Sequence, residues 1–403
     1  MSNPYSEIFR APGAKGFASA GFLARLPLAM TTMGIVAMLS QTHGEYWLAG
    51  AVAATFALTN AFVAPQISRL VDRFGQSRVL VPATTLAVAA FVALLVATYL
   101  RWPNWTLFAS AVLAGSLPSM PAMVRARWTE IYRDTPLLRT AFAFESVADE
   151  LVYIVGSVMS VGLSVTLFPE AGVLISTVSL AIGSTLFVMQ KSTEPRIQPV
   201  ARRQGRSAIF LRPVQIVTLT LIAVGTIFGT AEVTVIALTE AWGTPASASL
   251  VLGSYAVGSF IVGLVYGALK LTMPLARQFL IAVAIVAATT IPLLFIPNVP
   301  LLALLLLLSG VAISPTFITA FGLVEELVPA GKLTEGMTWV ITGIAIGMAI
   351  GSFTSGWVVD QYGAASGFWV SVAAGGIAFL VALLGQVSLK GAHRREAADL
   401  AAA

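Results

Sequence analysis

The sequence predicts an all-α membrane protein with twelve transmembrane helices, and three observations support this prediction. Of its 403 residues, 57% are hydrophobic and only 10% are charged, which is too little charge to cover a water-soluble surface. The apolar residues form long uninterrupted runs. The basic residues gather in the short segments between these runs, which is typical of a membrane protein. We therefore expect contact with membrane lipid and none with nucleic acid.

Each apolar run is long enough to cross a bilayer as a helix. A helix rises about 1.5 Å per residue, so about 20 residues span a hydrocarbon core of roughly 30 Å. Because the backbone polar groups in lipid must be satisfied within the segment, a helix is the expected form. The runs are residues 18–39, 47–67, 79–100, 105–124, 143–168, 171–190, 214–238, 247–269, 278–297, 299–322, 336–358 and 367–389.

The basic residues orient these helices. If the N-terminus is cytoplasmic, all of the 23 Lys and Arg residues except Arg25 and Arg101 lie in cytoplasmic segments, including those at 125–139. The opposite orientation would violate the positive-inside rule almost everywhere. We therefore expect a multi-pass protein of the inner (cytoplasmic) membrane with both termini in the cytoplasm.

A basic segment divides the chain into two halves. Residues 191–213 form the predicted cytoplasmic linker, between an N-terminal six-helix bundle at 1–190 and a C-terminal six-helix bundle with a short cytoplasmic tail at 214–403. The sequence around Gly115 and Pro118 in the fourth run is echoed at 310–315 in the tenth run. Such internal similarity is typical of duplicated transporter bundles, so we expect two pseudo-symmetric halves.

Small residues recur about every four positions in the fifth and eleventh runs. They are Gly156, Ser160 and Gly162 in the fifth run and Gly343, Gly347, Gly351 and Ser355 in the eleventh. In lipid, this spacing lets two helix backbones approach closely. We predict that both runs pack tightly through these residues.

The loop between the second and third runs, residues 68–78, resembles a known family motif. Its Asp72, Arg73, Gly75 and Arg78 match G-x-L-A-D-R-x-G-R-R of the major facilitator superfamily. Within that superfamily the chain looks closest to bacterial drug and sugar efflux members. The resemblance implies the superfamily fold, alternating access, and a loop that clamps the cytoplasmic ends of the halves. Physically, Asp72 suits a helix end and Gly75 suits a tight turn.

Two motifs of efflux members differ in this chain. Residues 111–115 lack the arginine of R-x-x-x-G in the fourth run, and Gly156 is followed by Ser157 instead of proline. The resemblance therefore leaves coupling to protons open.

Charged residues inside the apolar runs are candidates for coupling. A central Asp or Arg costs about 2.5–3.5 kcal/mol on insertion scales, so a cluster of them indicates a purpose. The fifth run holds Glu145, Asp149 and Glu150, and Arg25 lies at a similar depth in the first run. We predict that Arg25 pairs with Asp149 or Glu145; the alternative is that Arg25 reaches the headgroups. Repulsion among the acids should make at least one of them exchange protons.

The remaining candidate residues belong to the helices that line the central cavity in the resembled family. Glu232 in the seventh run either contacts substrate or protons or faces a hydrated vestibule. The predicted cavity residues are Thr31, Thr32, Met33, Ser116, Met120, Thr226, Thr230, Ser314 and Thr319. This thin scatter of hydroxyl and thioether groups suits an amphipathic or hydrophobic solute. For any one hydroxyl, a bond to its own helix is the simpler alternative.

The sequence thus predicts a secondary active transporter that moves a small solute by alternating access, most simply as an exporter. An uptake permease of the same fold is the first alternative, and a channel or a non-transporting membrane sensor is the second. With no cysteine, and only His43 and His393 as histidines, we expect no cysteine- or histidine-based metal site and no catalytic triad. We expect no enzyme activity, no cofactor, and a monomer whose partners are a small-molecule substrate, lipid and, if coupled, protons.

Overall fold

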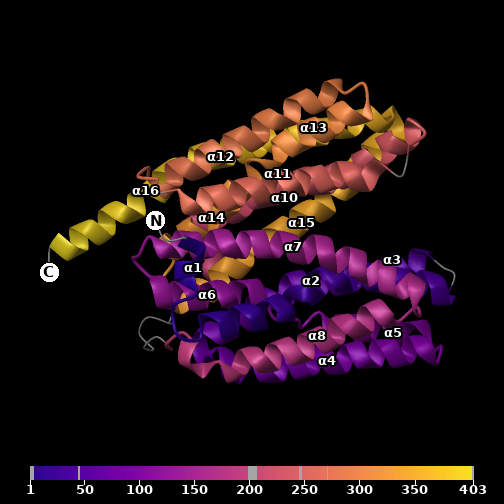
Figure 1. Cartoon of the computed structure of the whole chain (residues 1–403), viewed down its shortest axis with the longest axis horizontal. Coiled ribbons are helices and arrows are strands. Elements are labelled where there is room, and N and C mark those ends of the chain that lie inside the picture. The colour runs from indigo at the N-terminus through magenta and orange to yellow at the C-terminus, as the bar shows by residue number, and fades with distance from the viewer. Residues whose placement is uncertain (1–3, 44–45, 198–206, 245–246, 270, 402–403) are drawn as a thin grey trace. The chain divides into compact units, whose positions relative to one another are not determined.

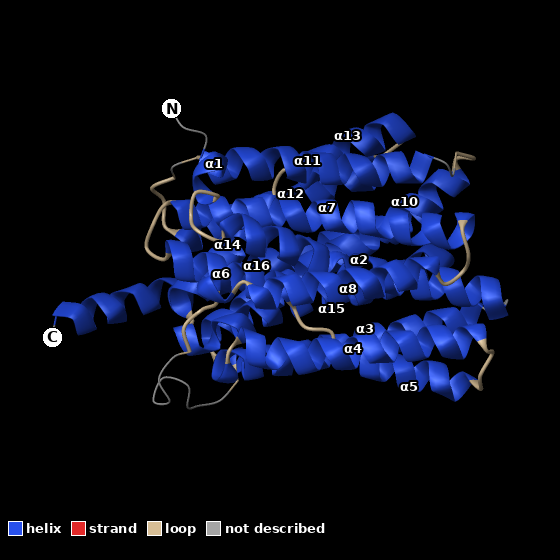
Figure 2. Ribbon diagram, turned by 60° about the horizontal axis from the view of Figure 1, so that its bottom comes forward, coloured by secondary structure: helices blue, strands red, loops and turns tan. Residues whose placement is uncertain are grey.

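The computed structural model describes residues 4–43, 46–197, 207–244, 247–269 and 271–401. Within these residues every regular element is a helix (Figure 2). The predicted all-α fold is confirmed. The central part of the predicted linker, 198–206, with the basic residues Arg202, Arg203 and Arg206, lies outside the described residues, as does Lys270.

Contacts along the chain define two compact units. The first unit comprises Met1–Ala141 and Ala148–Gly205, and the second comprises Phe142–Val147 and Arg206–Ala403. The boundary between Gly205 and Arg206 falls inside the predicted linker. Each unit is described by itself below.

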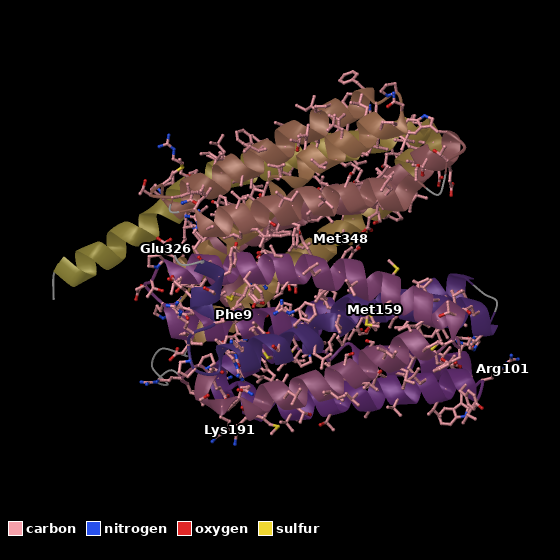
Figure 3. All side chains as sticks on the ribbon, in the orientation of Figure 1. Phe9, Arg101, Met159, Lys191, Glu326 and Met348 are labelled. Atoms are coloured by element: carbon pink, nitrogen blue, oxygen red, sulfur yellow. The ribbon has the colours of Figure 1, made fainter. Side chains whose placement is uncertain are left out.

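The first unit contains the first six predicted spans except the start of the fifth, since residues 142–147 belong to the second unit, and its helices run along one common direction (Figure 1). Its elements are α1 (Pro4–Ile8), α2 (Ala14–His43), α3 (Tyr46–Phe74), α4 (Gln76–Tyr99), α5 (Asn104–Ala114), α6 (Met120–Tyr132), α7 (Leu137–Thr166), α8 (Ala171–Met189) and the 3-10 turn η1 (Lys191–Thr193). Figure 3 shows Arg101 at the opposite end of this unit from Phe9 and Lys191. This arrangement agrees with the predicted outward position of Arg101.

The second unit contains the last six predicted spans. Its elements are η2 (Ala208–Phe210), α10 (Arg212–Ala241), α11 (Ala248–Ala268), α12 (Leu275–Thr290), η4 (Ile291–Phe295), α13 (Val299–Gly310), α14 (Ile313–Leu327), η5 (Ala330–Lys332), α15 (Leu333–Tyr362), η6 (Ala364–Gly367) and α16 (Phe368–Ala401). By length and apolar composition, 10 stretches of the described chain can each cross a membrane. The two further predicted spans are the α5–α6 pair and α7.

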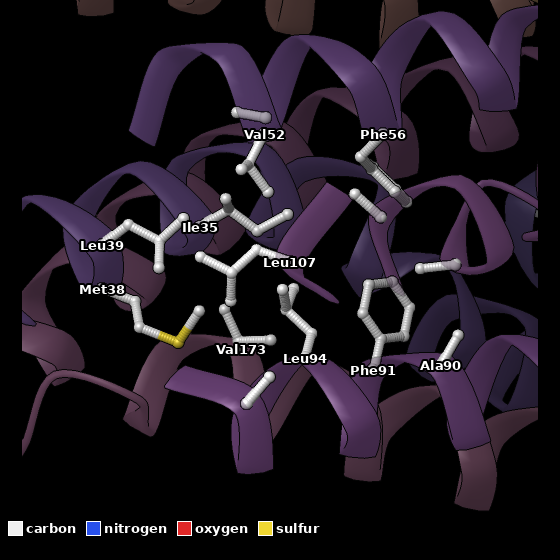
Figure 4. Close-up of a cluster of buried hydrophobic side chains, with 14 of the residues drawn as sticks. Ile35, Met38, Leu39, Val52, Phe56, Ala90, Phe91, Leu94, Leu107 and Val173 are labelled. Atoms are coloured by element: carbon white, nitrogen blue, oxygen red, sulfur yellow. The ribbon is translucent and has the colours of Figure 1, made fainter. Parts of the chain in front are cut away.

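The two units repeat one packing scheme. In the first unit α2 packs on α8, α4 packs on α8, and α3 packs on α5. The corresponding pairs of the second unit, α10 with α16, α12 with α16, and α11 with α13, are also in contact. In the first unit a buried cluster that includes Ile35, Phe56, Phe91 and Leu94 fills the space among α2, α3, α4, α5 and α8 (Figure 4). The predicted duplication therefore appears in the contacts of each unit.

Both fourth helices are broken where the sequences of the halves resemble each other. The predicted span 105–124 is not one helix, because α5 ends at Ala114 and α6 begins only at Met120. In the second unit α13 ends at Gly310 and α14 begins at Ile313. Proline near each break lacks the N–H that would continue the helix ladder. The first break, at residues 115–119, is wider than the second, at residues 311–312.

Small residues bring α10 and α15 into close contact, as predicted. A Cβ atom added to Gly347 or Gly351 would overlap the carbonyl oxygen of Ile222 or Thr226, respectively. In the first unit Gly156 packs against Ala29 and Met30 of α2, and Ser160 Oγ donates to the Met30 carbonyl at 2.7 Å. The prediction was wrong for Gly162, around which a Cβ atom would meet nothing within 4 Å.

Candidate functional site

A buried ion cluster joins three helices of the first unit. Asp149 of α7 accepts from Arg25 Nη1 of α2 at 2.7 Å through Oδ1. Its other oxygen, Oδ2, accepts from Arg125 Nη2 of α6 at 2.6 Å. The predicted pairing of Arg25 with Asp149 is therefore present. The sequence places Arg125 in a cytoplasmic loop, but in the structure it lies in α6 and completes the cluster.

The geometry of this cluster holds both guanidinium groups firmly. The Arg25 and Arg125 side chains are each 1% exposed, whereas Asp149 is 33% exposed. Each arginine also donates to a carbonyl one turn earlier in its own helix, Arg25 Nε to Gly21 and Arg125 Nη1 to Pro121. Charge-assisted bonds of this kind are among the strongest in proteins. One carboxylate thus fixes α7 against both α2 and α6.

The other predicted intramembrane acids occupy different surroundings. Glu145, one turn before Asp149 in α7, is buried, and Glu150 is half-buried. Two guanidinium groups, and not the neighbouring acids, make the closest charged contacts of Asp149. The prediction that at least one of the three acids exchanges protons stays a prediction. Glu232 is half-buried on α10.

The loop that resembles the family motif is a tight turn between α3 and α4. Gly75 connects the helices with φ +92°, a backbone conformation that residues with a side chain rarely adopt. Its N–H donates to the Val71 carbonyl at 2.8 Å. This confirms the turn predicted for Gly75. Asp72 is half-buried near the end of α3, and the Arg73 and Arg78 side chains are exposed.

The start of the linker binds this turn through Glu194. The Glu194 carboxylate accepts from the Ser77 backbone N–H at 2.8 Å and from the Ser77 hydroxyl at 2.5 Å. It therefore supplies negative charge to the first turn of α4, where backbone N–H groups have no partner inside the helix. A side chain on Gly75 would also approach Glu194 closely, since an added Cβ would lie 3.2 Å from its Oε1.

Arg127 of α6 connects the same linker segment to α4. Its Nε donates to Gln76 Oε1 at 2.8 Å, and its Nη1 donates to the Gln190 carbonyl at 2.7 Å and to Thr193 Oγ1 at 2.8 Å. The guanidinium carbon lies 3.7 Å from the centre of the Phe187 ring, a cation–π contact. Burial lowers the pKa of Arg127 to about 10, and the charge of Glu194 opposes this shift. Arg127 therefore remains protonated at neutral pH.

Removal of the Glu194 carboxylate should weaken the attachment of the linker. We expect Glu194→Ala to lower the stability of the protein by about 1 kcal/mol, the usual cost of losing a helix cap. The loss is measured as a lower thermal unfolding midpoint in detergent. Glu170→Ala is the matched control, because Glu170 precedes α8 without a capping bond from its side chain. Equal midpoints for the two variants would contradict the assignment.

The hydroxyl groups of several predicted cavity residues have partners within their own unit. Thr31 is buried between α2 and α8, where its hydroxyl lies 3.0 Å from Ser176 Oγ, and Ser314 pairs in the same way with Ser259 at 2.9 Å. Three hydroxyls bond carbonyls of their own segments: Ser116 to Leu113, Thr226 to Ile222, and Thr319 to Pro315. For these three residues, the hydroxyl bonds its own helical segment, which is the simpler alternative to lining a cavity.

The remaining cavity candidates differ in exposure. Met120 and Thr230 are buried, Thr32 is half-buried, and Met33 is 41% exposed. Within the described parts of the chain, the Thr230 hydroxyl on α10 has no hydrogen-bond partner. Among the described residues, no three His, Cys, Asp or Glu side chains gather as metal ligands would.

Comparison with known proteins identifies the fold. The model of the Major Facilitator Superfamily matches residues 217–400 of the chain. No curated protein matches the chain by sequence. The structure is similar to that of the human organic anion transporter TETRAN (TM-score 0.71, 14% identity, covering 93% of this chain and 100% of that chain).

Two further solved structures agree in fold. One is a bacterial homologue of the iron transporter ferroportin in its outward-facing state (TM-score 0.72, 16% identity, covering 92% of this chain and 98% of that chain). The other is the fucose:proton symporter of E. coli (TM-score 0.64, 16% identity, covering 92% of this chain and 98% of that chain). The predicted twelve-helix major facilitator fold is therefore confirmed.

Proposed function

We propose that this chain, which has the major facilitator fold, is a secondary active transporter that moves a small organic solute across a membrane by alternating access. The observation that carries the proposal is the repeated six-helix scheme, in which each unit has a broken fourth helix and a first helix closely packed against its fifth. Two such halves provide the two elements that alternating access requires. Both termini in the cytoplasm and an inner-membrane location complete the proposal.

Asp149 is the proposed coupling group of the first unit. Its carboxylate is partly exposed, whereas the arginines that bind it are buried, so a proton or a solute reaches Asp149 more easily than it reaches Arg25 or Arg125. Neutralising Asp149 would weaken its bonds to Arg25 of α2 and to Arg125 of α6 in one step. A buried charge cluster that can be opened by one proton is suited to coupling.

The solute is proposed to be amphipathic and the direction to be export, with uptake as the alternative. Threonine hydroxyls such as that of Thr230 offer hydrogen bonds within a largely apolar helix. The structurally similar proteins are named for organic anions, iron and fucose, so the fold by itself does not select a cargo. In a carrier, the gradient that drives it sets the direction of net transport.

Counterflow in proteoliposomes tests the proposal. A thermal-shift screen first identifies a ligand, and vesicles loaded with that ligand should then accumulate external labelled ligand transiently. A channel would equilibrate without this overshoot, and a sensor would bind ligand without moving it. If protons couple, the counterflow rate of the parent should depend on pH and that of Asp149→Asn should not. Binding without any counterflow would contradict the proposed function.

A further inference from the structure

The break in the fourth helix of the first unit leaves backbone groups that the helix cannot satisfy. Between α5 and α6, residues 115–119 are not helical. The Leu117 carbonyl would receive the N–H of residue 121 in a continuous helix, but residue 121 is proline and has none. In the apolar part of a membrane, an unsatisfied carbonyl is costly. A donor from elsewhere must therefore take its place.

Asn60 of α3 supplies that donor. Its Nδ2 donates to the Leu117 carbonyl at 2.9 Å and to the Gly115 carbonyl at 3.1 Å. Gly115 permits the approach, because an added Cβ there would lie 3.1 Å from the Asn60 backbone nitrogen and still closer to the Thr59 side chain. The amide group of one residue thus binds two carbonyls within the break.

The break also decides where the charges of α6 lie. In α6, which follows the break, Arg125 binds Asp149, and Arg127 binds Gln76 and the Gln190 carbonyl. Because no helix connects α5 to α6, the position of α6 depends on side-chain bonds such as those of Asn60. The corresponding break in the second unit spans only residues 311–312, and there Gly310 packs directly against the α11 backbone.

We propose that Asn60 is a positioning residue that holds the break at 115–119 and thereby sets the place of α6 and its two arginines. It acts through the backbone of the fourth helix and does not itself contact the ion cluster. Its effect on transport rests on the proposed function, whereas its effect on the position of α6 does not.

Spin labels on α5 and α6 test this inference without a substrate. The chain has no cysteine, so Leu113→Cys and Ile131→Cys introduce the only two labelling sites. In this background, Asn60→Leu keeps the side-chain size but removes the donor, and it should broaden or shift the distance distribution between the labels. Asn60→Gln, which keeps the amide, should recover part of the original distribution. Thr55→Val is the control, since the Thr55 hydroxyl bonds the Ala51 carbonyl of its own helix.

A distribution in Asn60→Leu that superimposes on that of the parent would overturn the inference. If Asn60→Leu does not fold, the double variant Asn60→Leu/Pro121→Ala tests the inference instead. Alanine at 121 supplies a backbone N–H for the Leu117 carbonyl. Recovered folding supports the role of Asn60, and no recovery contradicts it. In a folded variant, counterflow should slow while the half-saturating solute concentration stays unchanged. A parent without counterflow would refute only the proposed function, because the label distances still judge the role of Asn60.

Discussion

Replacement of Asp149 by leucine should destabilise the protein more than any other single change in the ion cluster. The variant leaves the guanidinium groups of Arg25 and Arg125, each 1% exposed, without the carboxylate that they share. Removing one partner of a buried ion pair typically costs about 3–5 kcal/mol, and we expect about 3 kcal/mol because Asp149 is partly exposed. The loss is measured as a lower thermal unfolding midpoint and a lower yield of folded protein in detergent.

A double-mutant cycle distinguishes a shared carboxylate from two independent losses. Arg25→Leu alone leaves Asp149 bound to Arg125, so it should cost less than Asp149→Leu. In the Asp149→Leu background, Arg25→Leu should cost still less, because the bond from Arg25 to Asp149 is already absent. Strictly additive effects would contradict the cluster. Exchanging Arg25 and Asp149 is a poor test, since an arginine at 149 would face Arg125.

Valine at position 347 should separate α15 from α10 and produce the second large effect. Even a Cβ atom on Gly347 overlaps the Ile222 carbonyl, so the two backbones must move apart. Close backbone packing is a main source of helix association in lipid. We expect a loss of about 3 kcal/mol, the upper part of the usual cost of overpacking, measured by thermal unfolding in detergent.

Gly356→Ala on the same helix provides the control for Gly347→Val. An added Cβ on Gly356 meets nothing within 4 Å, and alanine favours the helix relative to glycine. This variant should be as stable as the parent or slightly more stable. If Gly347→Val and Gly356→Ala unfold at the same temperature, the close packing of α10 on α15 is not what stabilises the second unit.

The sequence predicted features that depend on a single segment or on one pair of opposite charges. The spans follow from apolar runs, the turn at Gly75 follows from its glycine, and the pairing of Arg25 with Asp149 follows from the cost of charges in lipid. These rules act locally or need only one partner. The structure accordingly agrees with them.

What the sequence could not predict depends on segments that meet only in the fold. Arg125 and Arg127 were assigned to a solvated loop, because basic residues near a membrane usually follow the positive-inside rule. The break in the fourth helix lets α6 turn both side chains inward. Asn60 and Glu194 act on residues more than 50 positions away in the sequence, and a lone polar residue or a linker acid gave little signal.

Which hydroxyl groups line a cavity also depends on segments that meet only in the fold. Helix membership alone does not decide whether a hydroxyl faces a cavity, a neighbouring helix or its own backbone. Thr226 and Thr319 each satisfy a carbonyl of their own helix, and Thr31 meets Ser176. Local bonds of this kind compete with substrate contacts for every threonine and serine in a membrane helix.

The most direct test of alternating access is thiol labelling of a single cysteine in sealed vesicles of known orientation. Ser116→Cys, half-buried at the break, should react with a membrane-impermeant reagent added from either side, and ligand should slow the reaction. Leu113→Cys on the exposed apolar surface of α5 should react from neither side. Reaction of Ser116→Cys from one side only, with and without ligand, would contradict the account.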